Sequence, residues 1–557
     1  MTGKTSDERV PLFSRPASGL VRELGSAKSA AYNVMGGCYG WNPGYSVTFV
    51  TLTLASALIL GWPLWTWVWL LALPFLAIYG LCFVWLCSSV PRSGGDYIYS
   101  SRIMSPYLGW IESFSLVVAC WSIAAAVVWQ SVTAIAQVVS INALLAPGSA
   151  WTWWASFFSN SVNFALVGVL EVAVLILFIS SPPRKVYWMI LVIAVLAVVA
   201  LPVFPLAMIG VTPEGFAVNF SKIAGQDVGT LLSNAETAGF ELGQQSGLQA
   251  PNMFLLWTWI LLLFSGYTWT AYMAGELKGN IARNVAWSIG LSLLGNMLWC
   301  GMLPVLFMKT IGYDFAAAWG WMSFNAPSSL PGGTLALAQV IAIIARPELS
   351  PLFTFASIFF AIMPPFLTGV LFTYMPTRIV FAWSMDRLAP AAMTKIGKRT
   401  GQPTYTLVLA AIALLIFFAW TVMGVSPLNT AWFGALVLAP SWIFPGLNCL
   451  LLPYRRPELY KRAAWKYNIG RVPLCAIFGL ISAAVFGAVM VGAYFYPILI
   501  RLLMTPSTLV YEYAVSSGII PTIAAFIAGT IYYVAVRWIQ RRRGIDLSLI
   551  YKSVPPE

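Results

Sequence analysis

Twelve stretches of this 557-residue chain are long enough and apolar enough to cross a lipid bilayer. A membrane-spanning helix needs about 20 predominantly apolar residues. Charged residues make up 9% of the chain, against roughly 25% in soluble globular proteins. The sequence therefore predicts an all-α integral membrane protein with twelve transmembrane helices. The predicted spans are residues 28–60, 63–90, 107–143, 160–180, 186–210, 252–277, 285–308, 351–384, 404–424, 428–452, 472–500 and 518–540.

The basic residues gather on one side of the predicted bilayer. With the N-terminus inside, all but four of the 31 Lys and Arg fall in the two tails and the inner loops. The exceptions are Lys222, Lys309, Arg346 and Arg501. Cytoplasmic loops carry such an excess, so we expect a multi-pass protein of the cell membrane with both termini cytoplasmic. This distribution accounts for the net charge of +13 without a nucleic-acid partner.

Two of the predicted spans are interrupted near their middles by small and polar residues. The first interruption runs from Met35 to Gly44, and the second runs from Phe264 to Thr270. Irregular main chain at membrane depth is tolerated only where it is buried in protein or lines a cavity. Matching interruptions in the two halves of a membrane protein are typical of a site for a small solute.

Four stretches then carry a family resemblance. Residues 91–100 read Pro-Arg-Ser-Gly-Gly-Asp-Tyr-Ile-Tyr-Ser, and residues 264–280 contain Phe-Ser-Gly-Tyr and Ala-Gly-Glu-Leu-Lys-Gly-Asn. Residues 377–390 join Thr-Arg to Asp-Arg-Leu-Ala-Pro, and residues 398–403 read Lys-Arg-Thr-Gly-Gln-Pro. Taken together and in this order, they resemble the amino acid–polyamine–organocation (APC) superfamily of permeases. That family carries P-x-x-G-G-x-Y-x-Y after span two, F-S-G-[FY] and E-x-K-N-P in span six, S-R…R-D-G-x-L-P closing span eight, and R-T-G-x-P before span nine.

The chain departs from the family pattern in two places. Gly36-Gly37-Cys38 stands where the family usually has G-S-G, and no proline follows Asn280. The main chain can still unwind at the two glycines. The bulkier third residue changes the wall of the expected site.

The resemblance implies a LeuT-type fold, in which spans 1–5 and 6–10 form a 5+5 inverted repeat with two further spans appended. The implied organisation is an N-terminal tail (1–27), a transport core (28–452), spans eleven and twelve (453–540) and a C-terminal tail (541–557). It also implies a secondary amino acid transporter that works by alternating access around the two interrupted spans. An amino acid/polyamine exchanger and a non-transporting receptor on the same fold are the alternatives.

An amino acid suits the interruptions because unwinding frees main-chain N–H and C=O groups. The N-terminus of a half-helix attracts a carboxylate, and carbonyls at the C-terminus of a half-helix attract an ammonium group. For the aromatic residues and the glycines, packing within the protein is the alternative role. The predicted substrate-binding residues are Met35, Gly36, Gly37, Cys38, Tyr39, Gly40, Leu262, Phe264, Ser265, Gly266, Tyr267 and Thr268.

Few ionisable residues lie inside the spans. Such residues are costly in a bilayer and are functional candidates. Glu171, in span four, and Glu112, near the inner end of span three, are the proton-coupling candidates, and Asp96 lies on the adjoining inner loop. Glu276, at the inner end of span six, is expected to be a surface or gate residue. Because no buried charge marks the expected pocket, the sequence favours neutral or bulky amino acids.

Sodium coupling is the alternative to proton coupling. A sodium site would need carbonyls of span one and hydroxyls of span eight, where Thr368 and Thr373 lie. Two long outer segments, 211–250 and 311–350, are predicted to be loops with short helices over the outer mouth.

The composition argues against an enzyme. The chain has no histidine, which removes His-based metal sites, general bases and proton relays. No cluster joins a nucleophile, a base and metal ligands. We therefore predict no catalytic residue, metal or cofactor, and we interpret the seven cysteines as small apolar packing residues. No feature of the sequence indicates an oligomeric state.

Overall fold

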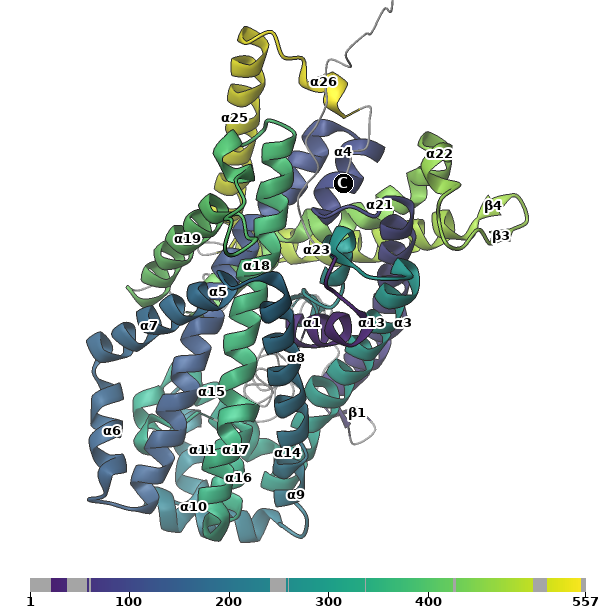
Figure 1. The fold of residues 1–557 in the computed structure, drawn as a ribbon. Coiled ribbons are helices and arrows are strands. Elements are labelled where there is room, and N and C mark those ends of the chain that lie inside the picture. Colours follow the sequence, from purple (N-terminus) through teal and green to yellow (C-terminus); the bar gives the residue numbers. More distant parts are fainter. Residues whose placement is uncertain are drawn as a thin grey trace, which may run out of the picture.

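A computed structural model of the chain describes residues 22–37, 58–59, 62–240, 257–258, 260–335, 337–423, 427–503 and 518–551. This part of the chain is almost entirely helical (Figure 1). Its strands form two short hairpins, β1 (Leu58–Ile59) with β2 (Trp62–Pro63), and β3 (Asn468–Ile469) with β4 (Val472–Pro473). The predicted all-α class is therefore correct.

Within the described ranges, ten helical segments are long and apolar enough to cross a membrane. They match ten of the twelve predicted spans. The other two predictions, 28–60 and 252–277, are the interrupted spans, and the structure describes them only in part, so the count of twelve stays a prediction. The helices that build the ten segments are α3 (Leu64–Ser89), α5 (Pro106–Leu145), α7 (Ser161–Ile179), α8 (Pro183–Ala200) with α9 (Val203–Ala207), α13 (Ile281–Asn296) with the π-helix η5 (Met297–Met302) and α14 (Leu303–Ile311), η8 (Pro347–Leu349) with α17 (Ser350–Ser357), the π-helix η9 (Ile358–Ile362) and α18 (Met363–Met385), α19 (Thr404–Val422), α20 (Pro427–Val437) with α21 (Ala439–Arg455), α23 (Leu474–Leu503) and α25 (Ile520–Arg542).

Shorter helices complete the described chain. The two long segments between predicted spans contain short helices, as the sequence predicted, among them α10, α11, α15 and α16. These helices gather at the lower end of the bundle in Figure 1, which we call the α10 end. The shorter elements are α1 (Ser26–Gly36), α4 (Gly95–Ile103), α6 (Ala150–Ser159), α10 (Pro213–Ala224), α11 (Val228–Thr237), η3 (Trp269–Tyr272), η4 (Ala274–Glu276), α15 (Tyr313–Asn325), η6 (Pro327–Ser329), η7 (Pro331–Gly333), α16 (Ala338–Ala345), η10 (Ala391–Thr394), α22 (Pro457–Tyr460) and α26 (Leu547–Ile550).

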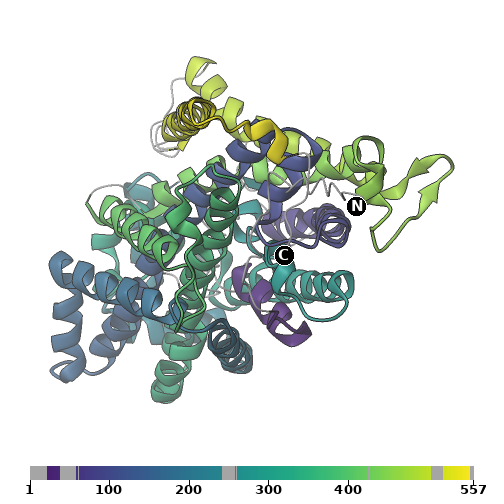
Figure 2. The same ribbon diagram turned by 45° about the horizontal axis from the view of Figure 1, so that its top comes forward.

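The long helices α5 and α18 pack against each other at the centre of the bundle. Helix α5 also contacts α4, α19, α20 and α25, while α1 packs against α13 and α8. The upper end in Figure 1, which we call the α4 end, carries α4 and α26. Figure 2 brings this end forward and shows the β3–β4 hairpin projecting beyond the helices.

A buried ion pair joins α4 to the end of α18. Arg102 Nη2 lies 2.6 Å from Asp386 Oδ2, and both side chains are 1% exposed. The Tyr97 hydroxyl donates to the same Asp386 oxygen at 2.7 Å. Because α4 holds both Arg102 and Tyr97, this contact fixes the helix against α18 at the α4 end.

Among the described residues, all cysteines but one follow the prediction, and Cys38 lies outside them. Cys82, Cys87, Cys120, Cys449 and Cys475 are free and buried, as packing residues would be. Cys300 is disulfide-bonded, so the interpretation as a packing residue is wrong for this position.

We predict that Asp386→Ala destabilises the protein by about 3–5 kcal/mol, because it leaves the buried Arg102 charge without its partner. Thermal unfolding of the detergent-purified protein measures this loss. Glu458→Ala is the matched control, since Glu458 pairs with Arg456 at the exposed surface and such pairs are worth about 0–1 kcal/mol. Equal melting temperatures for the two variants would contradict the assigned role of the buried pair.

Candidate functional site

The first interruption begins where α1 ends. The last helical hydrogen bond of α1 runs from the Gly37 N–H to the Asn33 carbonyl at 3.0 Å. Gly37 itself is extended, with φ −87° and ψ −156°, so the main chain leaves the helix at the predicted place. Cys38, Tyr39 and Gly40, which the sequence also assigned to the site, lie outside the described residues.

The second interruption replaces an α-helix by tight turns. Helical bonding reaches Phe264, whose N–H donates to the Ile260 carbonyl at 3.0 Å. Beyond it, Ser265 donates to Leu262 at 3.0 Å and Tyr267 to Phe264 at 3.1 Å. The chain continues as the 3₁₀ helices η3 and η4. The predicted break is therefore present, and the non-helical path runs on to Glu276, further than the sequence indicated.

The two interruptions touch each other through main-chain atoms. A side-chain carbon on Gly36 would lie 2.9 Å from the Gly266 carbonyl oxygen, and one on Gly266 would overlap the Gly36 carbonyl. Only glycine at both positions allows the backbones to approach this closely. Residues more than two hundred positions apart thus form one small region.

Two of the predicted residues present polar atoms in this region. The Ser265 hydroxyl is buried and has no hydrogen-bond partner among the described residues. The Thr368 hydroxyl of α18 donates to the Met35 carbonyl at 2.8 Å. Thr373 instead donates to Gly369 of its own helix at 2.7 Å. Of the two span-eight hydroxyls, only Thr368 therefore bonds to α1 in the structure.

The aromatic residues of the second interruption pack against the surrounding helices. The Tyr267 hydroxyl donates to the Leu76 carbonyl of α3 at 2.6 Å. Phe264 lies with its ring centre 4.9 Å from that of Trp69, and Trp269 lies 4.3 Å from Phe372. All three residues are buried, as is Leu262, so their side chains support the turns in this structure.

Asn33 ties the two interrupted segments together, and the sequence analysis missed it. Its Nδ2 donates to Thr270 Oγ1 and to Ser288 Oγ, both at 3.0 Å. Its Oδ1 accepts the Thr270 N–H at 2.9 Å, and Ser292 Oγ donates to its carbonyl at 2.8 Å. One amide side chain thereby satisfies a main-chain N–H that lost its helical partner. A polar residue inside an apolar stretch was the available signal.

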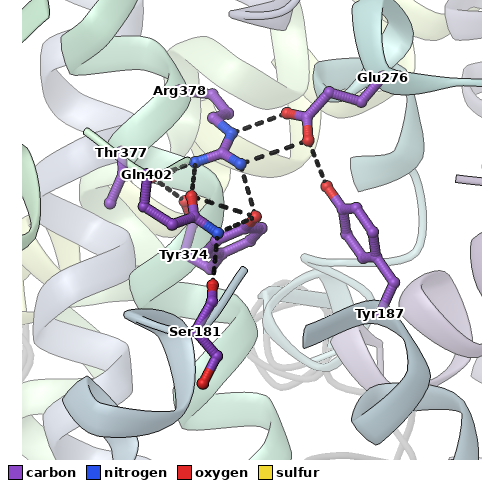
Figure 3. Close-up of polar contacts among 7 residues, drawn as sticks. All are labelled: Ser181, Tyr187, Glu276, Tyr374, Thr377, Arg378 and Gln402. Carbon is purple, nitrogen blue, oxygen red and sulfur yellow. Dashed lines mark hydrogen bonds and ion pairs between the residues drawn. The ribbon is translucent and has the colours of Figure 1, made fainter. Parts of the chain in front are cut away.

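A buried polar network closes around Glu276 at the end of the second interruption (Figure 3). Arg378 Nε donates to Glu276 Oε1 at 2.7 Å, and the Tyr187 hydroxyl donates to Glu276 Oε2 at 2.6 Å. Arg378 also donates to the Tyr374 hydroxyl at 2.5 Å and to Gln402 Oε1 at 3.1 Å. The Arg378 and Glu276 side chains are 0% and 1% exposed, so the expectation of a surface position for Glu276 is wrong.

This network connects separate parts of the fold. Glu276 ends η4, Tyr187 lies on α8, Tyr374 and Arg378 lie on α18, and Gln402 precedes α19. The segment before α1 joins it through the main chain, because the Leu24 N–H donates to the Glu276 carbonyl at 3.0 Å. Both interrupted segments are therefore fastened to the scaffold helices at this point.

The two predicted proton-coupling residues lie apart from each other. Glu112 is buried on α5 near the α4 end, where the Ser100 hydroxyl donates to it. Glu171 lies on α7, where its Oε1 is buried and has no hydrogen-bond partner among the described residues. Neither carboxyl forms a hydrogen bond with residues 262–268 in the described part of the chain.

One described cavity lies elsewhere. It has a volume of about 1010 Å³ and lies between α5, α6, α7 and η7, with Thr133, Gln137, Phe164 and Gly333 in its wall. It does not include any residue of the two interruptions. The candidate site is therefore defined by main-chain geometry, and this side cavity is separate from it.

Comparisons with known proteins agree with these features. The sequence profile of the family described as Amino acid permease matches residues 26–536. The chain is also 23% identical over 380 residues to the Glutamate/serine transporter AimA of Bacillus subtilis (strain 168). This alignment covers 64% of the chain and 60% of the relative's length.

We predict that Gly266→Ala destabilises the protein, because the added methyl group overlaps the Gly36 carbonyl. Forced overpacking costs about 1–3 kcal/mol, which thermal unfolding of the purified protein would detect. Gly290→Ala on α13 is the control, since a side chain there has nothing within 4 Å. If both variants melt at the temperature of the parent, the close approach of the two main chains is wrong.

Proposed function

This chain belongs to the amino acid permease family, and we propose that it is a secondary active amino acid transporter of the cell membrane that works by alternating access. The single observation that carries the proposal is the meeting of two interrupted helices at Gly36 and Gly266. Interrupted helices expose main-chain groups of opposite polarity at one place. The proposal includes a LeuT-type core over residues 28–452 with a 5+5 inverted repeat.

In the proposed site, a zwitterion bridges the two interruptions. The sequence offers the N–H groups of Gly37, Cys38 and Tyr39 to the substrate carboxylate. Because the Gly37 N–H already donates to the Asn33 carbonyl, the carboxylate meets the N–H groups of Cys38 and Tyr39, and the ammonium group meets the carbonyls of Leu262, Phe264 and Ser265. The Leu262 and Phe264 carbonyls each accept one turn hydrogen bond, which leaves a second lone pair on each oxygen. The unpartnered Ser265 hydroxyl is a further ligand for the substrate.

For the substrate, we propose neutral amino acids. Residues 29–37 and 260–275 contain no Asp, Glu, Lys or Arg, so no side-chain charge of these two segments selects for a charged substrate. The printed name of the relative includes serine, a small neutral amino acid, and also glutamate. Acidic amino acids are therefore the main alternative to neutral amino acids as the substrate class.

The Glu276–Arg378 network is the proposed closure at one end of the transport path. It lies at the end of the second interruption and fastens both interrupted segments to α8 and α18. The loops at the α4 end hold most of the basic residues, so we assign this end to the cytoplasm. Release of substrate to the cytoplasm then requires these bonds to open.

The first test is uptake by the protein reconstituted in liposomes. We expect labelled serine and other neutral amino acids to accumulate under an inward proton gradient and not under a sodium gradient alone. A panel of unlabelled competitors defines the substrate class. Competition by arginine, lysine or polyamines alone would overturn the neutral class, and substrate binding without uptake would favour a receptor.

The second test concerns Glu171 of α7, whose carboxyl oxygen Oε1 is buried. If Glu171 carries the coupled proton, Glu171→Gln removes accumulation driven by a pH gradient while substrate exchange continues. Unchanged proton-driven accumulation in this variant would reject Glu171 as the carrier and leave Glu112 as the remaining candidate. Exchange in liposomes without any gradient separates a loss of coupling from a loss of binding.

A further inference from the structure

Two buried carboxyl groups face each other at the α4 end. Asp96 lies in the first turn of α4 and Glu112 lies near the start of α5, and both residues are 0% exposed. From the sequence, we expected Asp96 on an inner loop and Glu112 to be a proton-coupling candidate without a partner carboxyl. Helix α4 packs against α5, and Ser100, one turn after Asp96 on α4, donates to Glu112, so both carboxyls lie where these two helices bury each other.

Each carboxyl has one oxygen that receives a hydrogen bond from a hydroxyl. The Tyr272 hydroxyl donates to Asp96 Oδ2, and the Ser100 hydroxyl donates to Glu112 Oε2. Asn448 of α21 in turn donates to Ser100 Oγ at 2.7 Å. The remaining oxygens, Asp96 Oδ1 and Glu112 Oε1, are buried and receive no hydrogen bond from another group in the described part of the chain.

Among the described residues, no positively charged side chain pairs with either carboxyl. The neighbouring titratable side chains are Tyr79 of α3, Tyr99 of α4, Cys120 of α5 and Tyr272 of η3, and all are neutral at pH 7 in their usual ranges. Within the described ranges, neither carboxyl forms an ion pair, and the buried arginines of this end pair with Asp386 and Glu276.

Two ionised carboxylates cannot share such a site, because burial and mutual repulsion both oppose the doubly charged state. Burial raises the pKa of the Asp96 carboxyl, which lies between the apolar spans. The pair therefore keeps at least one proton at neutral pH and titrates as a unit.

The pair connects directly to the second interruption. Tyr272 ends η3, two residues after Thr270, which Asn33 holds. Its ring lies over Gly95, which has φ +46° and where any side chain would overlap the ring. The Tyr272 carbonyl also accepts the Gly94 N–H at 3.0 Å. The paired glycines of residues 91–100 thus bring the non-helical chain next to the carboxyl pair.

We propose that Asp96 and Glu112 together form the proton-binding site that couples proton movement to transport, an inference that rests on the proposed function. The pair alternates between one shared proton, which leaves one negative charge, and two protons, which leave it neutral. Hydrogen bonds to an ionised carboxyl are stronger than those to a neutral one. The second proton therefore weakens the bond from Tyr272 and loosens the hold of α4 on η3.

The test uses proteoliposomes that contain the parent, Asp96→Asn or Glu112→Gln, with labelled serine or the neutral amino acid that the parent accumulates best. With one proton per substrate, a gradient of one pH unit supports about tenfold accumulation. We expect the parent to reach this and each variant to fall to about onefold, while exchange at equal pH stays within about twofold of the parent. A pH dye inside the liposomes should report substrate-dependent acidification for the parent alone.

Glu214→Gln is the matched control. It makes the same carboxyl-to-amide change at an exposed position in the first turn of α10, and we expect accumulation and exchange equal to those of the parent. Tyr272→Phe is a second probe, because it keeps both carboxyls and removes only the hydroxyl that joins Asp96 to η3. We expect it to retain exchange and to shift the pH dependence of accumulation.

The outcomes separate this inference from the proposed function. If the parent takes up and exchanges no amino acid, the proposed function fails. If the parent accumulates substrate with protons and both amide variants do the same, only the assignment of Asp96 and Glu112 fails. Equal loss of accumulation and exchange in folded variants, with an unchanged pH profile in Tyr272→Phe, would mean that the pair is structural.

Discussion

A main chain that leaves the helix inside a bilayer must find new partners for its N–H and C=O groups within the protein. The Asn33 side chain meets this requirement for the second interruption. It accepts the Thr270 N–H and donates to the hydroxyls of Thr270 and Ser288. Without such an amide, an unpaired buried N–H costs about 1–3 kcal/mol. The glycine contact between the two interrupted segments depends on this arrangement, because it fixes α1 beside the turns.

Buried polar groups at the α4 end have a similar role, since each polar cluster fastens an interrupted segment or a short helix to a continuous helix. Arg378 holds Glu276 at the end of η4, Tyr272 joins η3 to α4, and Arg102 joins α4 to α18. A buried pair is strongly destabilised when one partner is lost. In the proposed mechanism, a change in protonation or in substrate occupancy at this end acts on the bonds that hold the interrupted segments in place.

Local features of the sequence predicted the class and the interruptions, because both depend on composition within a short window. Apolar stretches of the right length predicted ten spans that the structure describes as helices. Gly36, Gly37, Ser265 and Gly266 marked the places where the helical path ends.

Pairings across the chain were not predictable in this way. Asn33 stood out as a polar residue in an apolar stretch, but its partners Thr270 and Ser288 lie 237 and 255 positions away. Glu276 and Arg378 lie 102 positions apart, so nothing near Glu276 indicated that its charge would be matched and buried. The sequence of one chain carries no signal for which distant charges meet. The position of Asp96 relative to Glu112 likewise depends on how α4 packs against α5.

The most direct test of the account is an experimental structure of the protein with a neutral amino acid bound in a membrane-like environment. The account predicts the substrate carboxylate at the main-chain N–H groups that follow Gly36, and its ammonium group at the carbonyls of residues 262–265. A substrate bound elsewhere, or both segments seen as uninterrupted helix in the loaded protein, would contradict it.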